Sequence, residues 1–172
     1  MVTTLFTTLA SLGIIALQIA IIIILIGWIT KAPFVKVVAQ HAGLITASIF
    51  GLATLISFVY QYGFGYEPCL LCWYQRIAII PIAILAWTAN LRTSKLLQTQ
   101  VLTLSLIGAV VALFHIVIDV FPTGIDVCGA ASVSCNVRYV YEFGYITIQV
   151  MSLTVLTAGI LLTLLARRYS SK

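Results

Sequence analysis

Glu67-Pro68-Cys69-Leu70-Leu71-Cys72-Trp73-Tyr74-Gln75-Arg76 is followed by an uncharged apolar run that extends from Ile77 to Trp87. Two thiols three positions apart therefore stand at the start of a helix that enters a membrane, and Pro68 suits a helix start because it has no N–H to lose. Helix N-termini and nearby cations favour the thiolate, which is the reactive form of cysteine. The stretch predicts a thiol pair that closes into a small disulfide ring and opens again.

Composition identifies the solvent around the chain. The 172 residues are 62% hydrophobic and 8% charged, with a mean hydropathy of +1.17, whereas roughly a quarter of the residues in a soluble domain are charged. The chain is therefore expected to be an integral membrane protein. The net charge of +5 does not indicate nucleic acid, because the basic residues stand at the ends of apolar runs instead of forming a patch with interleaved aromatics.

Five apolar stretches predict five membrane helices and an all-α, polytopic fold. They cover about 4–30, 42–60, 71–91, 101–120 and 144–166. Each is close to the ~20 residues that a helix needs to cross the hydrocarbon core. The first stretch is interpreted as a retained helix and not as a signal peptide, because it lacks a basic segment and its apolar run is too long.

Loop charges predict the orientation of the helices. If the five helices alternate, one side receives seven basic residues: Lys31, Lys36, Arg92, Lys95, Arg167, Arg168 and Lys172. The other side receives all four acids, Glu67, Asp119, Asp126 and Glu142, with only Arg138 and the membrane-edge Arg76 as cations. Because Lys- and Arg-rich loops stay in the cytoplasm, the N-terminus and all four cysteines are expected outside and the C-terminus inside. Disulfide chemistry persists on that side of a cell membrane.

The second cysteine pair, Cys128 and Cys135, lies in a polar loop and leaves three interpretations open. The first is a zinc site, because the two pairs together supply the four ligands that zinc needs. However, the spacing of the second pair is not that of a C-x-x-C motif. Two static structural bridges are the second alternative. The three-residue spacing of Cys69 and Cys72 closes a strained, reducible ring, which favours redox chemistry at that pair.

Three polar residues near the same membrane boundary are candidate ligand-binding residues. Arg76 lies one turn below Cys72 on the same helix face, where its charge is costly in lipid and could stabilise a thiolate or an anionic ligand. His115 stands five residues before the end of the fourth apolar stretch, and Gln61 follows the end of the second. A packed histidine and an interfacial glutamine are the alternatives to a binding role.

These residues resemble a known family. The run Pro68-Cys69-Leu70-Leu71-Cys72-Trp73-Tyr74-Gln75-Arg76 is similar to the P-C-x-L-C-x-Y-x-R signature of the DsbB disulfide-bond formation proteins. The run Phe143-Gly144-Tyr145-Ile146-Thr147-Ile148, after a closely spaced cysteine pair, is most similar to the BdbC branch. The resemblance covers about 40–166. Three features differ: the first helix is additional, Gln149 stands where a proline is common, and the loop between Cys128 and Cys135 is short.

The resemblance implies a four-helix bundle, here with one extra N-terminal helix, so residues 1–36 are expected to form that helix and a cytoplasmic loop and residues 37–172 the redox bundle. It implies a quinone-dependent thiol–disulfide oxidoreductase of the cell membrane. Such a protein reoxidises an extracytoplasmic thioredoxin-like (DsbA-like) partner and passes the electrons to ubiquinone or menaquinone.

Matching positions give the roles that the family implies. Cys69 and Cys72 match the quinone-coupled pair, with Cys72 facing the quinone, and Cys128 and Cys135 match the pair that exchanges with the partner. Arg76, His115 and Gln61 match quinone-site residues. The rival functions are a vitamin K epoxide reductase-like enzyme, in which the loop cysteines precede the C-x-x-C motif, and a non-catalytic membrane protein with structural or zinc-binding cysteines.

Overall fold

A computed structural model describes residues 2–88, 91, 94–121, 128, 134–135 and 137–169. Its helices are α1 (Val2–Ile29), α2 (Pro33–Gln40), α3 (Ala42–Phe58), a π-helical turn (Val59–Gly63) that continues α3, α4 (Leu70–Thr88), α5 (Lys95–Val120) and α6 (Ile148–Arg168). Within the described residues, five helical segments are long and apolar enough to cross a membrane. The predicted all-α polytopic fold is therefore confirmed.

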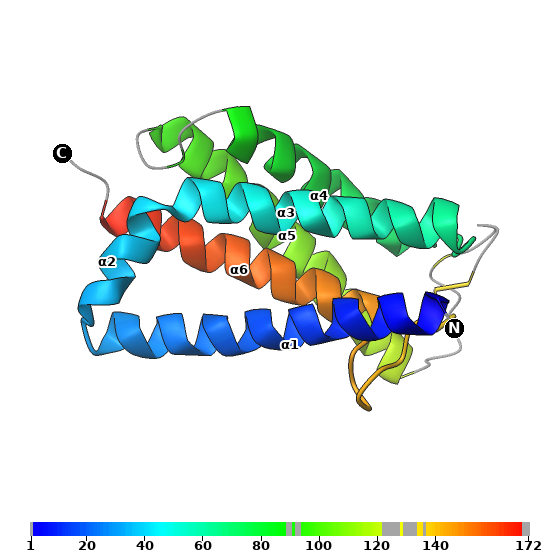
Figure 1. The fold of residues 1–172 in the computed structure, drawn as a ribbon. Helices are drawn as coiled ribbons and strands as arrows, with labels where there is room; N and C mark the ends of the chain where they lie inside the picture. The colour runs from blue at the N-terminus through cyan, green and yellow to red at the C-terminus, as the bar shows by residue number, and fades with distance from the viewer. Residues whose placement is uncertain are drawn as a thin grey trace.

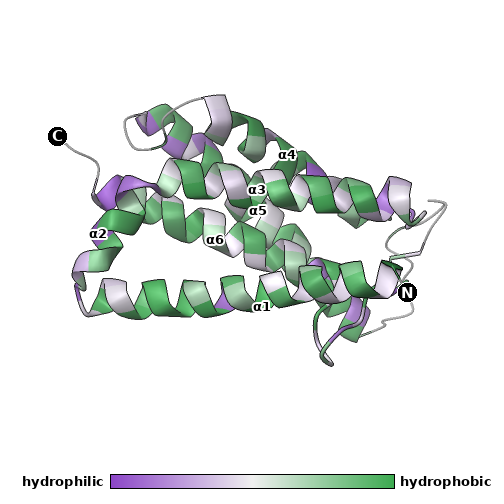
Figure 2. Ribbon diagram, in the orientation of Figure 1, coloured by the Kyte–Doolittle hydropathy of each residue, from purple (hydrophilic) through white to green (hydrophobic). Residues whose placement is uncertain are grey.

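Helices α3 to α6 form the bundle that carries the site, and α1 lies along one side of it (Figure 1). Hydrophobic residues make up most of the length of the helices, while hydrophilic residues are more frequent toward the two ends of the bundle (Figure 2). Helix α6 is the most buried of the spans. It contacts all five of the other α-helices and carries most of the packing between α1 and the bundle.

Close helix contacts are made possible by glycine. A Cβ atom added at Gly108 of α5 would lie 2.8 Å from a Leu156 methyl group and 2.9 Å from the Ala78 Cβ atom. Small residues at such crossings let helix backbones approach in a membrane, where packing drives association. Gly108 therefore sets the spacing of α4, α5 and α6.

The fifth apolar stretch does not begin as a helix at Gly144. Phe143 and Gly144 have positive φ angles of 52° and 77°, and the backbone of Glu142 pairs with that of Ile146 in a tight turn. Helix α6 begins only after Thr147, whose hydroxyl accepts a hydrogen bond from the Val150 N–H. The predicted start was wrong because apolarity does not report the left-handed backbone of a turn.

Two further boundaries differ from the sequence prediction. Helix α5 begins at Lys95, six residues before the predicted start, because the Ser94 hydroxyl caps it by accepting from the Leu97 N–H. Helix α2 was missed inside a predicted loop; it is one short amphipathic segment that buries Val35 and Ala39. Arg92, Asp126 and Lys172, which entered the charge count, lie outside the described residues.

Replacing Gly108 by leucine should destabilise the bundle. The larger side chain would overlap Leu156 and Ala78, and overpacking of this kind costs about 1–3 kcal/mol. We expect a lower midpoint of thermal unfolding in detergent. Gly13→Ala is the matched control, since a Cβ atom at Gly13 meets nothing within 4 Å. Equal midpoints for G108L and G13A would contradict this account of the packing.

Candidate active site

The first cysteine pair stands where α4 begins. The Sγ atoms of Cys69 and Cys72 lie 3.0 Å apart as free thiols, with Cys69 buried and Cys72 half-buried. The hydrogen bond from Cys72, aided by His115, holds the pKa of the Cys69 thiol below its ordinary value, although burial acts in the opposite direction. A lowered pKa favours the thiolate of Cys69, which is the form that takes part in thiol–disulfide exchange.

The second cysteine pair is closed and packs against the first. Cys128 and Cys135 form a disulfide with a Cα–Cα distance of 6.0 Å, and both are buried in one apolar cluster with Cys69, Leu71 and Ile118. Cys72 packs against the same cluster. The fold therefore gathers the four predicted cysteines at one end of the bundle, one pair oxidised and one reduced.

His115 of α5 links the two pairs. Its Nε2 atom lies 3.1 Å from the Cys135 carbonyl oxygen and 3.8 Å from the Cys69 Sγ atom. Because a carbonyl oxygen only accepts, Nε2–H is the donor, and Nδ1 then accepts from the Gln75 amide at 3.3 Å. The ring is 1% exposed. The structure thus places the predicted histidine between the cysteine pairs.

Two glutamines in this site were not predicted as site residues. Gln75 and Gln149 are both buried, and their amide groups lie 3.3 Å from opposite nitrogens of the His115 ring. A polar residue inside an apolar helix is itself a functional signal, since lipid offers it no partner; that signal would have identified both residues.

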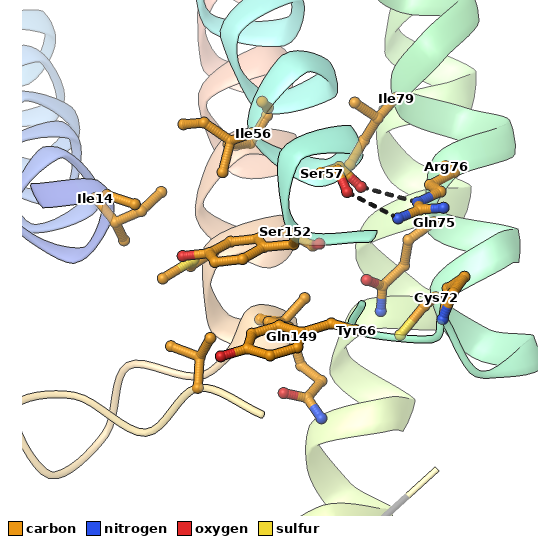
Figure 3. Close-up of a pocket in the computed structure, with 18 of the residues that line it drawn as sticks. Ile14, Ile56, Ser57, Tyr66, Cys72, Gln75, Arg76, Ile79, Gln149 and Ser152 are labelled. Carbon is orange, nitrogen blue, oxygen red and sulfur yellow. Dashed lines mark hydrogen bonds between the residues drawn. The ribbon is translucent and has the colours of Figure 1, made fainter. Parts of the chain in front are cut away.

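Arg76 connects α4 to the end of α3. Its Nε atom donates to the Ser57 hydroxyl at 2.8 Å, and Nη2 donates to the Ser57 carbonyl oxygen at 3.0 Å (Figure 3). Nη1 donates to the Gln61 side chain, so the structure brings Gln61 and Arg76 together as a pair. The guanidinium also lies over the rings of Phe58 and Trp73. Five N–H donors on a fixed plane allow Arg76 to hold this position and still face a ligand.

A cavity of about 510 Å³ extends from this end of the bundle into its apolar middle. Its polar end contains Cys69, Cys72, Gln75, Arg76 and His115. Its remaining walls come mainly from apolar residues of α1, α3 and α6, and Figure 3 shows Ile14 of α1 across the space from Arg76 and Cys72. Such a shape suits an amphipathic ligand with a polar ring and an apolar tail.

An ion pair holds the segment after Cys135. Arg138 donates from Nε to both carboxylate oxygens of Asp119, at 2.8 and 2.9 Å, and from Nη2 to the Asp119 backbone oxygen. The Asp119 side chain is only 6% exposed. The helix dipole disfavours the negative charge of Asp119 at the C-terminal end of α5, and the Arg138 guanidinium offsets that charge.

Comparison with known proteins identifies the family. The family model described as "Disulfide bond formation protein DsbB" matches residues 39–166. The chain belongs to the DsbB family. It is therefore a multi-pass membrane oxidoreductase of disulfide bond formation, as the cysteine pairs predict.

Individual DsbB-family relatives agree with this assignment. A "Probable disulfide formation protein" from Chlamydia caviae is 37% identical over 100 residues, which cover 58% of this chain and 71% of the relative. A "Probable disulfide formation protein C 2" from Bacillus anthracis is 32% identical over 111 residues, covering 64% and 79%. The "SPbeta prophage-derived disulfide bond formation protein B" from Bacillus subtilis is 35% identical over 105 residues, covering 61% and 70%. No solved structure matches the chain significantly.

Replacing Asp119 by asparagine should loosen the anchorage of the loop disulfide of this DsbB-family protein. Loss of a partly buried ion pair of about 1 kcal/mol corresponds to roughly fivefold more frequent local opening. We expect Cys128–Cys135 to be reduced about fivefold faster by dithiothreitol, measured by timed alkylation and mass spectrometry. Glu142→Gln is the control, because the Glu142 carboxylate makes no ion pair with any residue that the structure describes. Identical rates for both variants would contradict an anchoring role.

Proposed function

We propose that this protein is a quinone-dependent thiol–disulfide oxidoreductase that reoxidises an extracytoplasmic thioredoxin-like, DsbA-like protein. The observation that carries the proposal is the cavity, because it joins a redox-active thiol pair to an apolar space inside the membrane. The family membership supports disulfide formation as the overall reaction. Ubiquinone and menaquinone both have the required chemistry.

The residues around the cavity fit a quinone. A quinone ring has two carbonyl oxygens that accept hydrogen bonds, and Arg76 and the amides of Gln75 and Gln149 are donors at the cavity wall. The apolar side chains of α3 and α6 suit a prenyl tail. A bound quinone would supply the oxidant, accepting two electrons and two protons as the Cys69/Cys72 dithiol becomes a disulfide.

Electrons reach Cys69 and Cys72 through the second pair. A thiolate of the reduced partner attacks the Cys128–Cys135 bond and forms a mixed disulfide, and the second partner thiol resolves it, so the partner leaves oxidised and Cys128 and Cys135 become thiols. These thiols then reduce a Cys69–Cys72 disulfide by the same two-step exchange, and their own bridge is restored. His115 contacts both pairs, which allows it to orient Cys69 and the Cys135 backbone during the exchange.

The proposal includes an orientation in the cell membrane. The N-terminus and both cysteine pairs lie outside the cytoplasm, and the C-terminus lies inside. Support comes from most of the described basic residues at one end of the bundle, among them Lys31, Lys36 and Arg167, and from the acids Glu67, Asp119 and Glu142 at the other end, where Arg76 and Arg138 are the cations. Residues 37–172 act as the redox bundle, and 1–36 as an addition to it.

Cys72→Ser tests the proposed reaction. A serine hydroxyl cannot form the disulfide that must be regenerated at the end of α4, so thiol-dependent quinone reduction by the purified protein should fall to the uncatalysed rate. The reaction is followed by the absorbance of the quinone with a reduced thioredoxin-like protein as donor. Ser48→Ala serves as the control and should turn over like the wild type, because Ser48 is exposed and does not line the cavity. Undiminished turnover in C72S would refute the assignment.

One rival function has an observation in its favour. The donor atoms of Cys69, Cys72 and His115 all lie within 4.8 Å of one another, which is a possible arrangement for three zinc ligands. The same preparation distinguishes the two functions. Stoichiometric zinc in protein without thiol-dependent quinone reduction supports a metal site, whereas turnover that persists after chelation supports the redox proposal.

Arg76→Ala tests the binding role of the guanidinium. Loss of a charged hydrogen-bond donor worth about 1.5–3 kcal/mol should raise the KM for quinone by roughly ten- to a hundredfold, with a smaller effect on the KM for the protein partner. Arg167→Ala is a matched loss of charge at the opposite end of the bundle, where Arg167 donates to Thr99. A normal quinone KM combined with a defect toward the partner would place Arg76 in partner recognition instead.

A further inference from the structure

Helix α1 lies outside the matched region of the family, which begins at residue 39. Nevertheless, it supplies one wall of the cavity that ends at Cys72 and Arg76. The wall residues run from Leu9 to Ala20 at helical spacing. Eleven residues correspond to about 16 Å along the helix axis, or roughly half of the hydrocarbon thickness. The additional helix therefore follows the cavity from its polar end toward the middle of the bilayer.

The wall of α1 leaves space instead of filling it. A Cβ atom at Gly13 would meet no atom within 4 Å, although Gly13 borders the cavity. By contrast, Gly27 on the same helix is packed tightly against Phe34 and Val35. Gly13 is exposed, and the residue next to it, Ile14, lies across the cavity from Arg76 and Cys72 (Figure 3).

Contacts on either side of this open region fix the position of α1. Near its N-terminus, Phe6 packs edge-on against Tyr60 and Phe64. Farther along, Gln18 donates to the Thr154 hydroxyl at 3.1 Å and accepts from the Tyr145 hydroxyl at 2.8 Å. These contacts bridge α1 to the π-helical turn, α6 and the turn before it, and Gly13 lies between them along the helix.

We propose that α1 is the outer wall of a channel for the apolar tail of the quinone, and that its small residues around Gly13 determine how bulky a tail the protein accepts. The inference rests on the proposed function, because the occupant follows from the thiol pair and Arg76 at the polar end of the same cavity. The ring occupies the end formed by α4, and the tail runs between α1, α3 and α6. A lipid acyl chain in the same space is the competing occupant.

Gly13→Phe tests the wall directly because it places an aromatic ring in the open part of the channel. The purified full-length protein is titrated with a quinone that carries a prenyl tail and with the same ring without a tail. Binding is measured by quenching of intrinsic tryptophan fluorescence at one fixed detergent concentration. We define the affinity ratio as the affinity for the tailed quinone divided by the affinity for the tailless ring. This ratio should fall about tenfold in G13F, because the apolar contacts of the tail are lost.

Leu12→Phe is the matched control. Leu12 is the neighbouring residue on α1, is 48% exposed and does not line the cavity, so the wild-type ratio should be retained. Ala16→Phe, one turn farther along the same wall, replaces G13F if the latter unfolds at a lower temperature than the wild type.

Three outcomes are distinguishable. A lower affinity ratio in the wall variants, with L12F unchanged, supports the channel. An unchanged ratio in folded G13F and A16F overturns it, leaves the proposed function standing, and is the result expected if a lipid chain fills the space. If the wild type binds neither compound, the proposed function fails, and the inference fails with it.

Discussion

Hydrocarbon offers no hydrogen bonds, so a charged or strongly polar side chain inside the bundle is costly unless the protein supplies it with a partner. This constraint organises the reactive end of the molecule. Arg76 is held by Ser57 and Gln61, and His115 donates to the Cys135 carbonyl oxygen and accepts from the Gln75 amide. The helices that supply these groups are thereby fixed relative to one another, and the thiols of α4 receive a defined polar environment at the edge of an apolar bundle.

The same constraint connects the two cysteine pairs. His115 belongs to α5, but its ring reaches the sulfur of Cys69 and the backbone beside the second disulfide. The Arg138–Asp119 ion pair holds the following segment to the end of α5. Short-range exchange between sulfurs requires such proximity. In this protein the proximity of the sulfurs is supported by two contacts near Cys135. The buried His115 ring contacts the Cys135 carbonyl group, and the partly buried Arg138–Asp119 ion pair holds the segment that follows.

Several features follow directly from the sequence. Long apolar runs predicted five membrane helices, and cysteine spacing with loop charge predicted that the four sulfurs share one end. Apolar runs and cysteine spacing can be read within one segment of the chain, and loop charge can be summed from one loop to the next. The turn before α6 was missed because Phe143 and Gly144 are apolar in composition but adopt a left-handed backbone. Helix α2 was missed because a segment of 8 residues has too few turns for a periodic signal.

The cavity and the glutamine contacts could not be predicted from such signals. Both depend on how helices distant in the sequence face one another: Gln75 lies on α4, His115 on α5 and Gln149 on α6. The contribution of α1 to the cavity wall also depends on how helices distant in the sequence face one another. Its sequence specifies a membrane helix, but only its placement beside α6 shows that part of its surface borders a void and not a neighbouring side chain.

The short helix α2 has a mechanical consequence. It buries Val35 and Ala39 in a cluster with Leu161 and Leu165 of α6, while the aromatic contacts of Phe6 secure the opposite end of α1. Because α1 is held by packing at both ends, it resists moving away from the bundle. The separation between α1 and the bundle is thus held by packing at both ends of the helix, and the width of the cavity is a property of the assembled fold.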